Sequence, residues 1–260
     1  MKDLLQYTGY LFDLDGVLWR GKEAVPGAPD TVKKLKQLGK RVLFVTNNAG
    51  TTRKTQHQKL LNMGFPAAIE EVVTSGYATA RHLMERFGPS QIFVMGTEEL
   101  ATEMKECGHT VVSDNAGFVV VGYDPEFSYA KLDAAFQTLR KDGGMFVACN
   151  TNPILPTEDG FHPGVGPSVQ ALATCLGRGP DLIVGKPHEP IMQISLEALG
   201  LPANECVMTG DMVEHDLEWA AAFDMDTVFV LSGVQDETEL ARRGFKPTFI
   251  KGSVADFFHG

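Results

Sequence analysis

Short apolar segments alternate with helix-like segments along most of this chain, and this alternation limits the folds that it can adopt. Residues 10–12 and 41–45 have the character of buried strands, and residues 29–38 between them have the apolar spacing of a helix. Buried strands of this kind suit a parallel sheet that is covered on both faces. The alternation therefore predicts an α/β fold with a Rossmann-like parallel sheet. Further strands are expected at 72–73, 92–95, 111–112, 118–121, 145–149, 182–184, 206–208 and 227–231, and further helices at 51–63, 77–87, around 132–139 and at 190–199.

The middle of the chain differs in composition from its two ends. Residues 150–167 are rich in Asn, Pro and Gly, which predicts a long loop, and long loops inside compact domains usually carry function. The segment 177–180, Gly-Arg-Gly-Pro, is typical of a hinge. We therefore expect a core domain in two pieces, residues 1–86 and 181–260. A smaller α/β cap domain, residues 87–180, would be inserted between them.

Composition excludes several classes of partner. The chain has 260 residues, of which 43% are hydrophobic, enough for a sizeable core. A formal net charge of −10 argues against nucleic acid and anionic membranes as partners. The four cysteines form no CxxC pair, which disfavours a zinc site. No signal-peptide pattern and no apolar run of membrane-spanning length occurs, so we expect a cytoplasmic protein.

Polar side chains follow several of the predicted strands at the point where each strand ends. Because the carboxyl ends of parallel strands share one edge of a sheet, we expect these side chains to converge there. They are Asp13 and Asp15 after the first strand, Thr46, Asn47 and Asn48 after the second, Lys186 after the strand at 182–184, and Asp211 after the strand at 206–208.

This set of side chains is suited to a phosphate group. Asp13 can attack phosphorus to form an aspartyl-phosphate. Asp15 can protonate the leaving oxygen and then activate water. Lys186 supplies a compact positive charge, and the Thr and Asn side chains offer donors to phosphoryl oxygens. Asp13 and Asp211 together form a hard oxygen site that suits Mg²⁺.

The same residues resemble, in order, the four motifs of the haloacid dehalogenase superfamily. Thr46 follows Asp13 by 33 positions, which leaves room for one helix and one strand. Lys186 follows Thr46 by 140 positions, which leaves room for a cap. A cap at that place is similar to the NagD and p-nitrophenyl phosphatase-like branch. The motifs are Asp13-x-Asp15-Gly16, Thr46-Asn47, Lys186-Pro187, and Gly210-Asp211 with Asp216 behind it.

The resemblance implies a HAD-like core and a reaction. Asp13 would be the nucleophile, and Asp15 would be the general acid and base. The cofactor would be Mg²⁺, bound by the Asp13 carboxylate, the Asp15 backbone carbonyl and Asp211. The implied activity is hydrolysis of small phosphomonoesters by a magnesium-dependent phosphatase.

The resemblance also implies supporting roles and a partner. Thr46, Asn47, Asn48 and Lys186 would bind phosphate. Asp216 would orient Lys186 or a metal-bound water rather than contact the metal. The partner would be a small phosphorylated metabolite, and caps of this kind can also form the contacts of a homodimer.

Simpler interpretations exist for single residues. Asp13 and Asp15 could be turn formers, since Asp often bonds its own backbone in loops. Asp211 could cap a helix, and Asp216 could be a solvated helical acid. Trp19 could belong to a flap after the first motif or to the core. In the cap loop, His162, Glu158 and Asp159 could contact substrate or simply face solvent.

Other functions fit part of the pattern. A dehalogenase needs no acid at the position of Asp15. A phosphomutase shares both acids, but its cap follows the first motif. A non-catalytic regulator that binds a phosphometabolite is a different class of function, but it gains nothing from two carboxylates that face a phosphate. A phosphotransferase on the same scaffold is a further alternative. The substrate stays open among sugar phosphates, phosphoglycolate, nucleoside monophosphates and pyridoxal phosphate.

Overall fold

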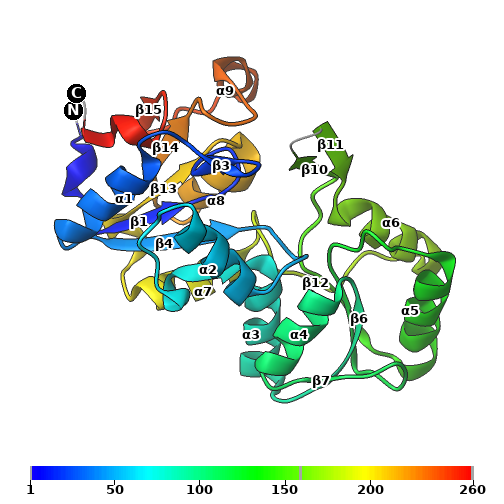
Figure 1. Cartoon of the computed structure of the whole chain (residues 1–260). Coiled ribbons are helices and arrows are strands. Elements are labelled where there is room, and N and C mark those ends of the chain that lie inside the picture. Colours follow the sequence, from blue (N-terminus) through cyan, green and yellow to red (C-terminus); the bar gives the residue numbers. More distant parts are fainter. Residues whose placement is uncertain (1, 158–159, 259–260) are drawn as a thin grey trace. The chain divides into compact units, whose positions relative to one another are not determined.

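The computed structural model describes residues 2–157 and 160–258, and contacts between residues divide the chain into two compact units. Unit 1 comprises residues 1–46, 57–73 and 195–260, and unit 2 comprises residues 47–56 and 74–194. Each unit contains a parallel sheet with helices beside it (Figure 1). The α/β class is therefore confirmed. The cap boundaries at residues 87 and 180 stay a prediction.

The main sheet has its strands in the order β15-β14-β13-β1-β4-β5. Strand β1 lies between β13 and β4 and runs parallel to both, with Phe12 opposite Thr209 on one side and Phe44 on the other. The first motif therefore emerges from the middle of the sheet. The strands are β1 (Gly9–Phe12), β4 (Arg41–Thr46), β5 (Val72–Thr74), β13 (Cys206–Gly210), β14 (Asp226–Val230) and β15 (Phe249–Lys251).

Both faces of the main sheet are covered, as continuous apolar strands require. All four residues of β1 are buried, and Tyr10 and Phe12 pack with Val32 and Leu35 of α1 on one face. On the other face, Phe229 packs against Val213, Leu217 and Leu240. Burial on both sides fixes the strand ends that carry the site. The remaining strands in this part of the chain are β2 (Trp19–Arg20) and β3 (Glu23–Ala24), which pair as an antiparallel hairpin.

Helix α1 shows how local sequence sets the ends of the elements. It begins at Ala28 with Pro29 in its first turn, where the absent N–H of proline is not needed. Gly39 lies just beyond the end with a φ of 74°, a left-handed conformation that suits glycine. The other helical segments outside the inserted sheet are α2 (Arg53–Asn62), α7 (Glu189–Leu199), α8 (Glu218–Ala221), α9 (Glu237–Arg243), η1 (Leu4–Gln6), η2 (Ile69–Glu71), η3 (Ala203–Glu205), η4 (Val213–Leu217) and η5 (Val254–Phe258).

Unit 2 is built on a second parallel sheet with strand order β12-β9-β8-β6-β7. Its inner strand β8 has buried residues at Val119, Val120 and Val121, as expected for a covered sheet. The strands are β6 (Gln91–Met95), β7 (Thr110–Val111), β8 (Phe118–Val121), β9 (Met145–Ala148) and β12 (Leu182–Ile183), and the helices are α3 (Ser75–Phe87), α4 (Glu98–Glu106), α5 (Tyr129–Asp142) and α6 (Val165–Leu176).

Two expectations from the sequence are wrong. The strand before Lys186, β12, pairs with β9 of the second sheet, so Lys186 does not follow a strand of the main sheet. The strand has two residues, too short for any periodicity to indicate its sheet. The expected loop at 150–167 instead contains an antiparallel pair, β10 (Ile154–Thr157) and β11 (Gly160–Pro163), and the start of α6. Gly160 and Pro163 stand at the two ends of β11, whereas Pro156 lies within β10, and Gly166 and Pro167 lie in the first turn of α6.

Within the described residues, none of the helices is both long and apolar enough to cross a membrane. All four cysteines, which belong to the described part of the chain, are free thiols.

A buried carboxylate from α4 fixes the start of α2 inside unit 2. Glu103 is 3% exposed, and its carboxylate accepts a hydrogen bond from the Arg53 backbone N–H. Glu99, one turn earlier, accepts from the Thr52 N–H at 2.9 Å and from the Thr55 hydroxyl at 2.7 Å. These acids satisfy backbone donors that a helix leaves unpaired at its first turn. Burial raises the pKa of Glu103 above its ordinary value.

We predict that Glu103→Gln stabilises the protein at neutral pH, because the neutral amide keeps the acceptor oxygen and removes a buried charge. A carboxyl whose pKa is raised on folding contributes stability below its unfolded pKa and loses it as pH rises through the folded pKa. The gain in Tm should therefore be clear at about pH 7.5 and absent at about pH 4. Glu98→Gln, on the exposed face of the same helix, should give no such gain. An equal Tm change at both pH values would contradict this account.

Candidate active site

The strand register brings acidic residues from distant parts of the sequence to one edge of the main sheet. Phe12 lies opposite Thr209 of β13, so Asp13 and Asp211 follow the ends of two neighbouring strands. The Asp13 N–H donates to the Thr209 carbonyl at 2.9 Å, which continues the ladder by one residue. Thr46 ends β4 on the other side of β1 and is 4% exposed. For these residues of unit 1, the convergence expected from the sequence is present.

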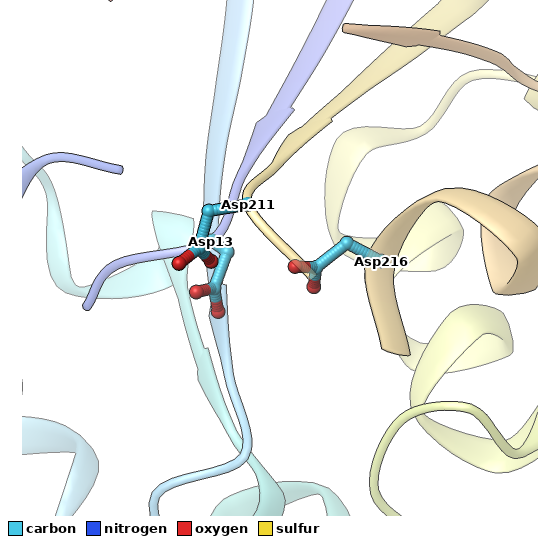
Figure 2. Close-up of side chains that lie close together, drawn as sticks. All are labelled: Asp13, Asp211 and Asp216. Carbon is cyan, nitrogen blue, oxygen red and sulfur yellow. The ribbon is translucent and has the colours of Figure 1, made fainter. Parts of the chain in front are cut away.

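Three carboxylates meet at this edge. Asp13, Asp211 and Asp216 each offer an oxygen, and these oxygens lie within 4.8 Å of one another. Figure 2 shows the carboxyl groups turned toward one another from β1, from the end of β13 and from η4. Asp211 and Asp216 are each 1% exposed, and Asp13 is half-buried. Like charges this close and this dry repel strongly, so the cluster favours a bound cation.

The residues that hold Asp211 explain two glycines of the sequence. Its Oδ2 atom accepts a hydrogen bond from the Val234 N–H at 2.7 Å. A Cβ atom at Gly16 or at Gly233 would overlap the Asp211 carboxylate. Gly16 also has a φ of 84°, which suits the tight turn after β1. The Asp211 side chain is therefore enclosed between two backbone segments that must lack side chains.

Asp216 is held by the irregular turn that follows β13. Its Oδ2 atom accepts from the Met212 N–H at 3.1 Å, and a Cβ atom at Gly210 would overlap the Asp216 side chain. The segment η4 has the wide turn of a π-helix, a geometry often found at functional sites. Asp216 was expected only to support other residues. Its carboxylate instead lies in the cluster itself, close enough to share a cation.

Asp15 is not one of the three clustered carboxylates. It is exposed, and its Oδ1 atom accepts a hydrogen bond from the Trp19 indole N–H at 2.7 Å. Trp19 is fully buried, packs edge-on to Phe65 at 6.4 Å between ring centroids, and has the Lys59 ammonium 4.3 Å from its ring centroid. A fixed indole therefore orients the Asp15 carboxylate. The sequence left Trp19 open between flap and core, because nothing in its spacing marks this hydrogen bond.

The predicted phosphate-binding residues after Thr46 lie in unit 2. The Asn47 side chain bonds the backbone of Lys186, accepting from its N–H at 2.7 Å and donating to its carbonyl at 2.8 Å. The Asn48 side-chain oxygen accepts from the Gly50 and Thr51 N–H groups at 3.0 and 3.1 Å, which shapes the loop before α2. Lys186 is 3% exposed.

Three residues of the expected loop at 150–167 were candidates for substrate contact, and the structure describes one of them. His162 lies on β11 and is exposed. Glu158 and Asp159 lie outside the described residues.

The donor set of the carboxylate cluster fits a hard divalent cation. Mg²⁺ and Ca²⁺ prefer carboxylate oxygens, and thiolate and imidazole ligands favour other metals. Asp13, Asp211 and Asp216 supply only oxygens, and a divalent charge offsets much of their repulsion. The residues present therefore suit the class of metal that the sequence predicted.

Comparisons with known proteins agree with this site. A family described as haloacid dehalogenase-like hydrolase matches residues 10–110, and one described as HAD-hydrolase-like matches residues 183–257. The chain is 34% identical to 5'-nucleotidase YutF of Bacillus subtilis, over 96% of this chain and 97% of that protein. It is 35% identical to an acid sugar phosphatase of Staphylococcus haemolyticus, over 94% and 92% respectively. A crystal structure of 4-nitrophenylphosphatase from Thermotoga maritima superposes with a TM-score of 0.94 at 31% identity, covering 100% of this chain and 99% of that one.

The chain belongs to the haloacid dehalogenase-like hydrolases. The proteins compared above are a nucleotidase and two phosphatases by name, and all three names denote hydrolysis of phosphate esters. The family and the phosphatase class predicted from the four motifs are therefore confirmed.

We predict that Gly233→Ala displaces the Asp211 carboxylate, because the new methyl group would occupy its space. Loss of one well-placed ligand should lower phosphatase activity by about tenfold or more and raise the Mg²⁺ concentration needed for half-maximal rate. Titration of Mg²⁺ against phosphate release measures both. Gly179→Ala is the control, because a Cβ there meets no atom within 4 Å. Unchanged Mg²⁺ dependence in Gly233→Ala would contradict this role of the glycine.

Proposed function

We propose that this protein is a magnesium-dependent phosphatase that hydrolyses small phosphomonoesters through a phosphorylated Asp13. The observation that carries the proposal is the meeting of Asp13, Asp211 and Asp216 at one sheet edge, while the Asp15 carboxylate accepts a hydrogen bond from Trp19. Asp13 lies in the carboxylate cluster, and Asp15, two residues later, is exposed and has its carboxylate bonded to a buried indole. This division of roles suits a nucleophile and a general acid.

The reaction proceeds in two halves. In the first, an Asp13 oxygen attacks phosphorus while the bond from phosphorus to the leaving oxygen breaks, and Asp15 donates a proton to that oxygen. In the second, Asp15 takes a proton from water, the water oxygen attacks phosphorus, and the bond to Asp13 breaks. Phosphate leaves, and both carboxylates return to their starting states.

Asp13, Asp211 and Asp216 would hold Mg²⁺, with the Asp15 backbone carbonyl as the further oxygen ligand that the family resemblance implies. When bound, the cation offsets the repulsion between the anionic nucleophile and the anionic phosphate. Asp216 thus has a larger part in the proposal than the sequence gave reason to expect.

In this proposal, Thr46, Asn47, Asn48 and Lys186 bind the phosphate group. The Thr46 hydroxyl at the end of β4 and the Lys186 ammonium are the proposed contacts to phosphoryl oxygens. Lys186 offers charge complementarity in a chain whose net charge is −10, so an anionic substrate depends on such a local cation. Asn47 and Asn48 can contribute backbone N–H groups at the end of the same strand.

The substrate class is a phosphate ester of a small metabolite. The names of the compared proteins cover a nucleotidase, a sugar phosphatase and a nitrophenylphosphatase, whose substrates share the phosphoester and differ in the leaving group. Residues 87–180 are the proposed cap, and the leaving group would be selected there.

We predict that Asp13→Asn abolishes phosphate release from p-nitrophenyl phosphate, a loss of at least roughly 10³-fold, because an amide cannot form the aspartyl-phosphate. The fold should persist, since the amide has the size of the carboxyl group. Thermal unfolding of the variant checks the fold, and the Mg²⁺ dependence of the wild type, tested with chelator, checks the metal. Turnover near the wild-type rate in Asp13→Asn would exclude the mechanism.

The same assay separates the enzyme from a regulator that only binds a phosphometabolite. A wild-type protein that binds inorganic phosphate but releases none from a broad panel of phosphoesters would favour the regulator.

A further inference from the structure

The Asn47 side chain has a set of hydrogen bonds that the proposed function does not use. Its Oδ1 atom accepts from the Lys186 N–H at 2.7 Å, and its Nδ2 atom donates to the Lys186 carbonyl at 2.8 Å. The same Nδ2 atom donates to Oδ1 of Asn152 at 2.8 Å. All three residues belong to unit 2, although 139 positions separate Asn47 from Lys186.

This pattern engages the whole donor capacity of the Asn47 amide. An amide nitrogen carries two hydrogens, and both have an acceptor here. The orientation of the amide is fixed by chemistry, because the Lys186 N–H can only donate and the Lys186 carbonyl can only accept. The Asn47 side chain therefore has no hydrogen left for a phosphoryl oxygen in this arrangement.

The surroundings hold Asn47 itself in place. Its carbonyl accepts from Nδ2 of Asn150 and from the Ser75 hydroxyl, both at 2.7 Å. Asn150 is 2% exposed and Ser75 is fully buried, so water competes little for these bonds. Gly185 completes the fit, since a Cβ there would lie 2.7 Å from Oδ1 of Asn47. Only glycine at position 185 lets the peptide before Lys186 lie this close to the Asn47 side chain.

We propose that Asn47 is a positioning residue that fixes the Lys186 backbone, and that its side chain acts on phosphate only through the Lys186 ammonium. The inference rests on the proposed function, in which Lys186 binds the phosphate. A lysine has four rotatable side-chain bonds, so a fixed backbone limits where its charge can lie. Asn152 supports Asn47 in this role from the loop after β9.

A double-mutant cycle tests the proposal with the full-length protein and p-nitrophenyl phosphate. Asn47→Ala should lower kcat/KM by about tenfold or more in the wild-type background, as expected for the loss of several hydrogen bonds. In the Lys186→Ala background the same change should alter kcat/KM by less than about twofold, because there is no ammonium left to position. Thermal unfolding of each variant confirms that it is folded. A purely structural defect would lower activity in both backgrounds.

Equal losses in both backgrounds, with normal wild-type turnover, would overturn the positioning role and leave the proposed function intact. Absence of wild-type turnover would overturn both. If Asn47→Ala does not fold, Asn152→Ala replaces it in the cycle, since it removes one of the three bonds. Asn152→Ala should lower kcat/KM by about threefold in the wild-type background. In the Lys186→Ala background it should leave kcat/KM unchanged.

Discussion

The repulsion among three carboxylates at one sheet edge is the constraint on which the rest of this structure depends. Asp13 and Asp211 follow neighbouring strands that burial on both faces of the main sheet keeps in register, and Asp216 lies on η4 after the second of these strands. A cation among the oxygens offsets this repulsion. Gly16 and Gly233 enclose Asp211 at a distance that any side chain would prevent. Packing and charge together therefore produce an oxygen cluster that suits a hard metal ion.

A second constraint concerns Lys186, the lysine proposed to bind the phosphate. Lys186 follows a two-residue strand of the second sheet, so the main sheet does not position it by register. The Asn47 amide bonds the Lys186 backbone directly, and Asn47 is joined by one peptide bond to Thr46 at the end of β4. In the positioning role proposed for Asn47, its side chain fixes the Lys186 backbone, whereas strand pairing fixes Asp13 and Asp211.

The sequence predicts the acids better than it predicts their partners. Asp13 and Asp211 could be placed together because each follows a buried apolar strand, and parallel strands end at a common edge. Asp216 and Trp19 could not be assigned, because their roles depend on side-chain contacts across turns with no periodic signal. The pairing of β12 has no signal in the sequence because two residues carry no pattern, and turn-forming residues conceal the antiparallel pair of β10 and β11.

The central claim is that Asp13 carries the phosphoryl group during turnover. Borohydride reduces an acyl phosphate to an alcohol, so quenching the reaction with borohydride would convert a phosphorylated aspartate to homoserine. Peptide mass spectrometry then locates the change. The account predicts homoserine at position 13 only when both p-nitrophenyl phosphate and Mg²⁺ are present. Modification at Asp15 or another acid, or none during steady turnover, would contradict it.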